Sequence, residues 1–205
     1  MDSTPVKICK KMALSPLGRE NLNFAEEAKT IFSFLEGMGL ILINSSDTLV
    51  EYSNNSLSVV LYHGRQSYEI GCEIVNQGVV YYISEIITIY DVDLGSKYRD
   101  AVASTPEDVR RGLIRLRDIF IKYALNAVRG DHETFSNLAN QRRIWAKDLE
   151  LKTKISSIKP RADEAFRLRN YAEASELYNQ IRDNLTPSES IKADLALERA
   201  LRQSE

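Results

Sequence analysis

The chain has 205 residues, of which 43% are hydrophobic and 27% are charged, and its formal net charge is −2. This length and composition exclude a disordered chain and suit a globular protein with a buried core. The small net charge hides an asymmetry. Residues 20–100 have a charge balance of −8, whereas residues 141–169 have a balance of +5. Such a difference indicates either an unevenly charged solvated surface or patches that steer partners to one face.

The sequence favours a cytoplasmic protein. Its two cysteines, Cys9 and Cys72, cannot form a disulfide framework, and neither belongs to a zinc-type cluster. The N-terminal segment lacks the apolar core of a signal peptide. The longest apolar run, residues 39–43, is far too short to span a bilayer.

Composition and periodicity divide the chain into three parts. Residues 1–22 contain prolines and a glycine without a helical or strand period, so we expect a mobile N-terminal arm. Residues 23–130 should form an α+β domain, and residues 131–205 a helical extension. The predicted fold class is α+β, with an antiparallel β-meander of four to five strands packed on helices, followed by an all-helical C-terminal part.

The meander follows an N-terminal helix and a short strand. Residues 49–83 alternate apolar and polar side chains between turn signals at residues 54–55, 63–65 and 76–78. Because successive side chains of a strand point to opposite faces, one face can be assigned to the core. That face should carry Leu57, Val59, Leu61, Tyr68, Ile70, Cys72 and Ile74.

The opposite, polar face of the meander is the candidate binding surface. Seven of the ten tyrosines lie between residues 50 and 100. Tyrosine offers a large contact area at low entropic cost and is enriched at interfaces, although aromatic residues also simply favour strands. The predicted partner-binding residues on this face are Glu51, Tyr62, Glu69, Glu73 and Tyr82.

Helices are expected to dominate after the meander. Residues 84–90 could form a short helix or one more strand, and we favour the helix. Residues 91–104 are interpreted as an irregular loop. Thr105 followed by Pro106 and two acidic residues is a strong helix start, because the hydroxyl caps free backbone N–H groups and the acids face the positive end of the helix dipole. A further helix is expected over about residues 132–155.

Residues 160–203 resemble a single tetratricopeptide repeat followed by one more helix. Small residues stand where two helices would touch, aromatic residues lie beside them, and a proline closes the unit. Arg169 occupies the position where a turn glycine is usual. We expect an antiparallel helix pair with Tyr171, Ala174 and Tyr178 in its seam, and a last helix packed on the long helix before it.

The sequence contains no catalytic or cofactor-binding constellation. The two histidines, His63 and His132, lack a third partner for a metal site or a catalytic triad. Glu69 and Glu73 lie four residues apart on one predicted strand, hence about 13 Å apart, whereas glycosidase carboxylates are about 5–9.5 Å apart. Gly-rich phosphate-binding loops are absent. We therefore expect a protein that is not an enzyme and has no metal or cofactor.

The basic run of residues 141–161 could contact phosphate groups. Its charges are spread around a helix, however, and no nucleic-acid-binding motif accompanies them. We therefore do not expect nucleic acid as a partner. Trp145, which lies within this run, is predicted to pack in the core or against another helix.

Three sequence features together resemble a known group of proteins. They are F-x-F-L-x-G-M-G-L at residues 32–40, VEYSNNSLSVVLYHGRQSYEIGCEI at residues 50–74, and the Thr-Pro-Glu-capped helix that ends at Arg129-Gly130-Asp131. Over about residues 24–140 the chain resembles small uncharacterised bacterial proteins, some of which are similar to the immunity proteins encoded beside polymorphic toxins. The resemblance assigns no role to any single residue.

Two functions from different classes are compatible with the sequence. The first is an immunity or inhibitor-type protein, whose acidic, tyrosine-bearing sheet covers a basic surface of a partner such as a toxin. The second is a structural or adaptor subunit that docks into a complex through its C-terminal helices. In both cases the partner is another protein rather than a membrane, and self-association into a homo-oligomer is left open.

Overall fold

The computed structural model of the chain describes residues 18–54 and 56–203. The chain divides into two compact units between Leu138 and Ala139. The helical part was expected to begin at residue 131. The division lies later because Leu138, with 1% of its surface exposed, belongs to the core of the first unit.

The expected N-terminal arm can be followed only at its end, since residues 1–17, with Cys9, lie outside the described residues. The short 3₁₀ helix η1 (Arg19–Leu22) belongs to the folded part, because Leu22 is fully buried in the core of the first unit. Folded structure thus begins a few residues earlier than the arm was expected to end.

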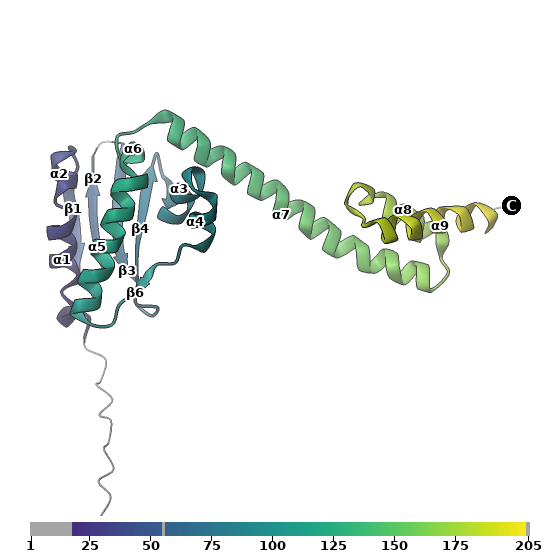
Figure 1. Cartoon of the computed structure of the whole chain (residues 1–205), viewed down its shortest axis with the longest axis horizontal. Coiled ribbons are helices and arrows are strands. Elements are labelled where there is room, and N and C mark those ends of the chain that lie inside the picture. The colour runs from purple at the N-terminus through teal and green to yellow at the C-terminus, as the bar shows by residue number, and fades with distance from the viewer. Residues whose placement is uncertain (1–17, 55, 204–205) are drawn as a thin grey trace, which may run out of the picture. The chain divides into compact units, whose positions relative to one another are not determined.

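An antiparallel sheet forms the centre of the first unit (Figure 1). Five strands follow one another in the order β1-β2-β3-β4-β5, and β6 also pairs with β4. The predicted α+β class and meander are therefore confirmed. The strands are β1 (Ile41–Ser46), β2 (Leu49–Ser53), β3 (Leu57–His63), β4 (Glu69–Asn76), β5 (Val79–Tyr82) and β6 (Ala101–Val102).

The predicted core face of the sheet is confirmed. Tyr68 is partly buried, and the other six residues of this face are buried. The six are Leu57, Val59, Leu61, Ile70, Cys72 and Ile74.

The β4–β5 turn also follows its sequence signal, since Gln77 and Gly78 both have positive φ, at 51° and 78°. This is the backbone of a two-residue type I′ hairpin turn.

Helices cover the core face of the sheet. Figure 1 shows α1 and α5 lying across it, and the rings of Phe32 and Phe120 pack edge to face with their centroids 5.7 Å apart. Ile86 and Ile87 of α3 are buried in the same core. The helices here are α1 (Phe24–Ile31), α2 (Phe34–Gly37), α3 (Ile83–Tyr90), α4 (Val92–Lys97), α5 (Pro106–Tyr123) and α6 (Leu125–Val128).

The segment between β5 and α5 is more regular than predicted. The short helix expected after the meander is present as α3, but the irregular loop expected over residues 91–104 is wrong, because it contains α4 and β6. Asp91 begins α4 by accepting a hydrogen bond from the backbone N–H of Leu94 at 2.9 Å. Gly95 lets α4 approach α3, since a Cβ there would lie 2.2 Å from Thr88 Oγ1.

The major helices begin at side-chain caps. Thr105 Oγ1 accepts a hydrogen bond from the backbone N–H of Asp108 at 3.2 Å, which confirms the predicted start of α5. At the start of α7 (His132–Arg167), Asp131 Oδ2 accepts a hydrogen bond from the backbone N–H of Thr134 at 2.9 Å. Both caps satisfy backbone donors that have no partner within their helix.

Helices α2, α6 and α7 end in the same backbone motif. Gly39, Gly130 and Arg169 have φ of 86°, 76° and 63°, in the left-handed region. The residue after each donates its N–H to a carbonyl in the last helical turn, at 3.2, 3.0 and 2.9 Å respectively. These are Schellman C-caps, in which glycine is favoured because it lacks a Cβ. Arg169 therefore stands in a glycine-type position.

The second unit is helical. Its elements are the long helix α7 (His132–Arg167), which starts in the first unit, α8 (Tyr171–Asn179), the 3₁₀ helix η2 (Arg182–Asn184) and α9 (Pro187–Gln203). The helix expected over about residues 132–155 is longer than predicted, since α7 continues through Pro160 to Arg167. A proline inside a helix costs roughly 3 kcal/mol. Burial of Ile158, Ala162 and Ala165 on either side of it offsets that cost.

The predicted helix seam of the second unit is confirmed. Ala174 and Tyr178 are fully buried, and Tyr171 is partly buried. Tyr178 Oη donates a hydrogen bond to Asp163 Oδ1 of α7 at 2.6 Å. Lys192 of α9 forms an ion pair with the same carboxylate. The last helix is thereby attached to α7, as expected.

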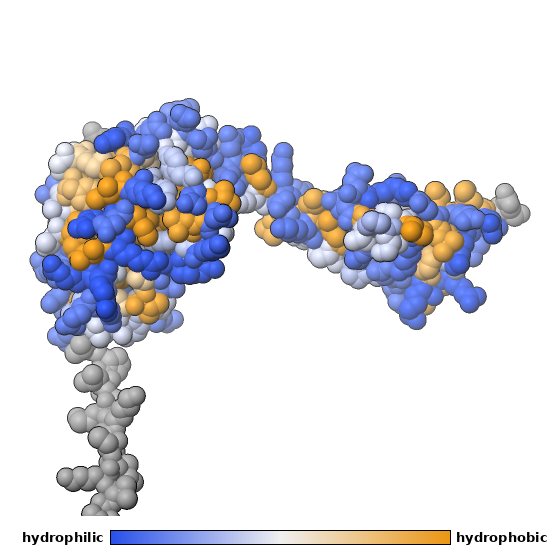
Figure 2. Space-filling view, viewed as in Figure 1, coloured by the Kyte–Doolittle hydropathy of each residue, from blue (hydrophilic) through white to orange (hydrophobic). Residues whose placement is uncertain are grey.

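The middle of α7 is exposed. Trp145 has 41% of its surface exposed and Leu149 has 67%, so the prediction that Trp145 packs inside the protein is wrong. Figure 2 shows hydrophobic residues scattered among hydrophilic ones along this helix. Within residues 18–54 and 56–203, no helix has the length and hydropathy needed to cross a membrane.

Candidate functional site

The helices of the first unit leave the polar face of the sheet uncovered, and we call it the open face. Its side chains are partly or fully exposed, except at Gly71. No lysine or arginine occurs among its paired positions. By strand register, these positions are Ile41, Asn44, Ser46, Leu49, Glu51, Ser53, Ser58, Val60, Tyr62, Glu69, Gly71, Glu73, Val75, Val80 and Tyr82.

Apolar and acidic side chains alternate across the centre of the open face. Glu51, Val60, Glu73 and Tyr82 are consecutive cross-strand partners on β2 to β5. Val75 lies on the same face of β4, and Tyr82 has 49% of its surface exposed. An apolar and aromatic centre with carboxylates beside it is typical of protein interfaces that select partners by charge.

Tyr62 lies across Gly71 and reaches Asp100. Tyr62 and Gly71 are partners in the β3–β4 ladder, and a Cβ on Gly71 would lie 2.2 Å from the Tyr62 ring. Tyr62 Oη donates a hydrogen bond to Asp100 Oδ2 at 3.0 Å. The hydroxyl of Tyr98 lies close enough to this carboxylate for each group to shift the pKa of the other. Asp100 Oδ1 is buried and has no hydrogen-bond partner among the described residues.

Partial burial governs the electrostatics of this cluster. Burial raises the pKa of Asp100, and the hydroxyl groups of Tyr62 and Tyr98 oppose the rise only in part. Burial, followed by the negative charge of Asp100, raises the pKa of both tyrosines, which therefore remain hydrogen-bond donors at neutral pH. Burial also raises the pKa of Glu73. The charges of Asp100 and Glu73 are thus partly removed from water, which strengthens their attraction for cations.

A cavity of about 200 Å³ opens beside this cluster. It lies where the edge of β4 is interrupted, because β5 pairs with residues 73–76 and β6 with residues 69–70. The chain leaves the sheet after Tyr82 to form α3 and α4, and it returns to the sheet at Ala101 in β6. The residues that line the cavity include Tyr62, Glu69, Tyr82, Tyr98, Arg99 and Asp100.

The five predicted binding residues all lie on the open face, and the cavity brings three of them together. Tyr62, Glu69 and Tyr82 line it, while Glu73 is the cross-strand partner of Tyr82. Glu51 stands apart, because Val60 separates it from Glu73. Which of these residues contacts a partner stays a prediction.

Sequence reasoning missed Gly71, Tyr98 and Asp100 as members of this site. Tyr98 and Asp100 lie in the segment that was interpreted as a loop, and nothing local places them beside β4. Gly71 did carry a signal, since a glycine inside an alternating strand marks a close approach of another group. Here the approaching group is the ring of Tyr62.

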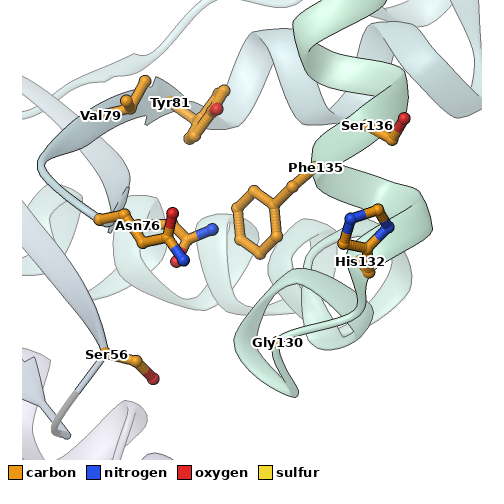
Figure 3. Close-up of a pocket in the computed structure, with 9 residues that line it drawn as sticks. Ser56, Asn76, Val79, Tyr81, Gly130, His132, Phe135 and Ser136 are labelled. Atoms are coloured by element: carbon orange, nitrogen blue, oxygen red, sulfur yellow. The ribbon is translucent and has the colours of Figure 1, made fainter.

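A second hollow, of about 530 Å³, lies between the β4–β5 hairpin and the start of α7. In Figure 3 the ring of Phe135 projects from α7 toward the side where Asn76 lies. The centroids of the Phe135 and Tyr81 rings are 5.5 Å apart. His132 and Ser136 also line the hollow, but its lining includes no carboxylate that could complete a catalytic triad with them.

His63 has a structural role. It was placed at a turn, but it is 1% exposed and its Nε2 lies 2.8 Å from the carbonyl oxygen of Ala103. Its ring stacks on Phe24 with the centroids 5.5 Å apart. Within the described part of the chain, no three or more His, Cys, Asp or Glu residues are grouped so that they could hold a metal ion.

Comparison of the sequence with protein-family models and with curated proteins, and of the fold with solved structures, found no match. The geometry of the open face is therefore the basis for the functional proposal that follows.

Proposed function

We propose that the protein is a non-enzymatic binding module of the cytoplasm, and that its open face binds a basic surface of another protein. One observation carries this proposal: a sheet face that the helices of its own unit leave uncovered combines an apolar centre, two tyrosines and three glutamates with no lysine or arginine at its paired positions. Large uncovered faces of this composition are typical of interaction sites.

The charge of the open face selects the partner. Two copies of this face would bring Glu51, Glu69 and Glu73 of each copy together, and like charges at an interface are unfavourable. A basic partner gains from the same carboxylates, because opposite charges accelerate the encounter and fix its orientation. The proposed partner is therefore a different protein with a basic contact surface.

Within this class we favour an immunity or inhibitor-type protein that neutralises a partner such as a toxin. Covering a basic active or binding surface requires an acidic face that is already formed. The hydrogen bond that holds Tyr62 over Gly71 supplies such preorganisation. The sequence resemblance described above points in the same direction.

The alternative function is an adaptor subunit that docks through its C-terminal helices. A specific observation supports it: Ile191 and Leu197 of α9 are 70% and 48% exposed. An isolated helix pair with a closing helix cannot form a solenoid groove by itself, but it can extend one in a partner.

Site-specific photocrosslinking in the cells that make the protein distinguishes these functions. A photoreactive amino acid would replace Val60 on the open face, Ile121 on α5 or Leu197 on α9, in three separate variants. The proposal predicts a crosslinked partner with a basic surface from position 60 and not from position 121, which is 44% exposed on another side of the unit. A partner captured only from position 197 would support the adaptor function, and capture only from position 121 would refute both.

A further inference from the structure

The cavity beside Asp100 has the chemistry of a pocket for a cationic side chain. Three tyrosines line it, Tyr62, Tyr82 and Tyr98, together with Glu69 and Asp100. Aromatic rings attract cations to their faces, and carboxylates pair with them. The sheet interruption beside Gly71 provides a hollow here instead of a flat surface.

The negative charge next to the cavity is incompletely compensated within the chain. Asp100 Oδ1 has no hydrogen-bond partner among the described residues. Arg99 also lines the cavity, but its Nη1 donates to the carbonyl oxygens of Tyr98 and Ser96 at 2.6 and 3.2 Å. Arg115, outside the cavity lining, lies near Asp100 and lowers the pKa of its carboxyl group less than burial raises it. A further cation would thus find unpaired carboxylate charge.

Arginine suits this pocket better than lysine. A guanidinium group is planar, stacks on aromatic rings and is more weakly hydrated than an ammonium group, so it loses less on entering a partly buried site. Within the chain, the guanidinium of Arg115 already lies 5.7 Å from the centroid of the Tyr98 ring. The tyrosine rings that line the cavity offer a guanidinium group the same kind of contact.

We propose that this cavity receives an arginine side chain of the partner and anchors it at one end of the open face. The proposal rests on the proposed binding function and names the chemical group that the partner presents. Interfaces are held by a few buried anchors, among which arginine is frequent, and such anchors sit in preformed pockets. Asp100 acts as a positioning residue, because its carboxylate accepts the hydrogen bond that holds Tyr62 and supplies charge beside the tyrosine rings.

A titration with small probes tests this without the partner. The ¹⁵N-labelled full chain is titrated with N-acetyl-arginine amide, and backbone amide shifts are followed by NMR. We expect saturable shifts at Gly71, Tyr98 and Asp100, with a dissociation constant on the order of millimolar. N-acetyl-citrulline amide, which has the same shape without the charge, should bind at least tenfold more weakly, and the lysine analogue should be intermediate.

Two variants complete the test. Asp100→Asn should weaken arginine binding at least tenfold, whereas Glu150→Gln, an exposed carboxylate on α7, should leave it unchanged. If Asp100→Asn fails to fold, Tyr82→Leu serves instead, because Tyr82 is 49% exposed and lines the cavity. The pocket proposal would be overturned if the citrulline or lysine analogue bound as tightly as the arginine analogue. It would also be overturned if both variants lost the same affinity for arginine, or if the shifts were centred elsewhere. Such a failure would leave the crosslinking result at position 60 intact, so the two proposals fail separately.

Discussion

Gly71 shows how a single residue determines the shape of the open face. Its missing Cβ leaves the space in which the Tyr62 ring crosses β4, and the ring in turn delivers its hydroxyl to Asp100. A strand glycine normally weakens a sheet. At this position the loss is balanced by a cross-strand contact and a hydrogen bond between segments that are far apart in the sequence.

Gly71→Ala should lower the free energy of unfolding by about 1–3 kcal/mol, because the added methyl group overlaps the Tyr62 ring and must displace it. Gly37→Ala is the matched control, since a Cβ at Gly37 meets nothing within 4 Å. This control should be neutral or stabilising by up to about 1 kcal/mol, as expected for alanine in a helix. Urea denaturation measures both values, and equal losses would refute the role assigned to Gly71.

Arg169 adopts a left-handed conformation that L-residues with a Cβ rarely favour. Arg169→Gly should therefore stabilise the protein by about 0.5–1 kcal/mol, after the greater flexibility of glycine in the unfolded chain is subtracted. Arg161→Gly, at an exposed position inside α7, should instead destabilise it by about 1 kcal/mol. Thermal and urea unfolding report both changes. A loss of stability in Arg169→Gly would show that its side chain makes a contact that outweighs the backbone strain.

At the scale of elements, small residues let the helices of the second unit approach closely. Its core is built largely from alanines on α7, α8 and α9, with Tyr178 and Ile181 between them. Such cores have little room for larger side chains. The charged residues Lys159 and Lys192 then connect α9 to α7 through Glu189 and Asp163.

Ala174→Leu should overpack the seam between α8 and its neighbours and cost about 1–3 kcal/mol, since Ala174 is fully buried. Ala172→Leu, two residues earlier on an exposed face of the same helix, should change stability by less than about 0.5 kcal/mol. Circular dichroism melting of both variants provides the measurement. A tolerated leucine at position 174 would contradict the described helix packing.

The attachment of α9 to α7 should depend on pH. The ion pair with Lys159 and hydrogen bonds from Thr186 lower the pKa of Glu189 to about 2. Its unfolded value is about 4.3, so its stabilising contribution is present above that pH and is lost as pH falls toward 2. Glu189→Gln should therefore be less stable than the natural protein at pH 6, and the difference should shrink by pH 2.5. Lys159→Met should reproduce this profile, and a difference that grows on acidification would refute the ion pair's role.

At the scale of the whole molecule, local patterns predicted the fold better than the site. Alternation along β3 and β4 identified the core face, and the cap at Thr105 marked the start of α5. Local patterns could not show that burial around Pro160 keeps α7 continuous. They also could not bring Asp100 to Tyr62, because this contact joins residues 38 positions apart through tertiary packing.

If the open face is the binding surface, its charges should affect the rate of binding. The carboxylates of the open face should accelerate the encounter with a basic partner, and this contribution depends on their location and not merely on their number. A variant that neutralises them should therefore bind more slowly while keeping its fold. A control variant with the same change of net charge elsewhere on the chain should not.

The decisive measurement is the association rate constant for the partner captured at position 60, obtained by surface plasmon resonance at low ionic strength. The triple variant Glu51→Gln, Glu69→Gln, Glu73→Gln should associate at least tenfold more slowly than the natural protein. The control triple variant Glu107→Gln, Glu150→Gln, Glu176→Gln alters exposed carboxylates outside the open face and should associate at the natural rate. Equal slowing in both triple variants, or none in the first, would contradict the assignment of the open face as the binding surface.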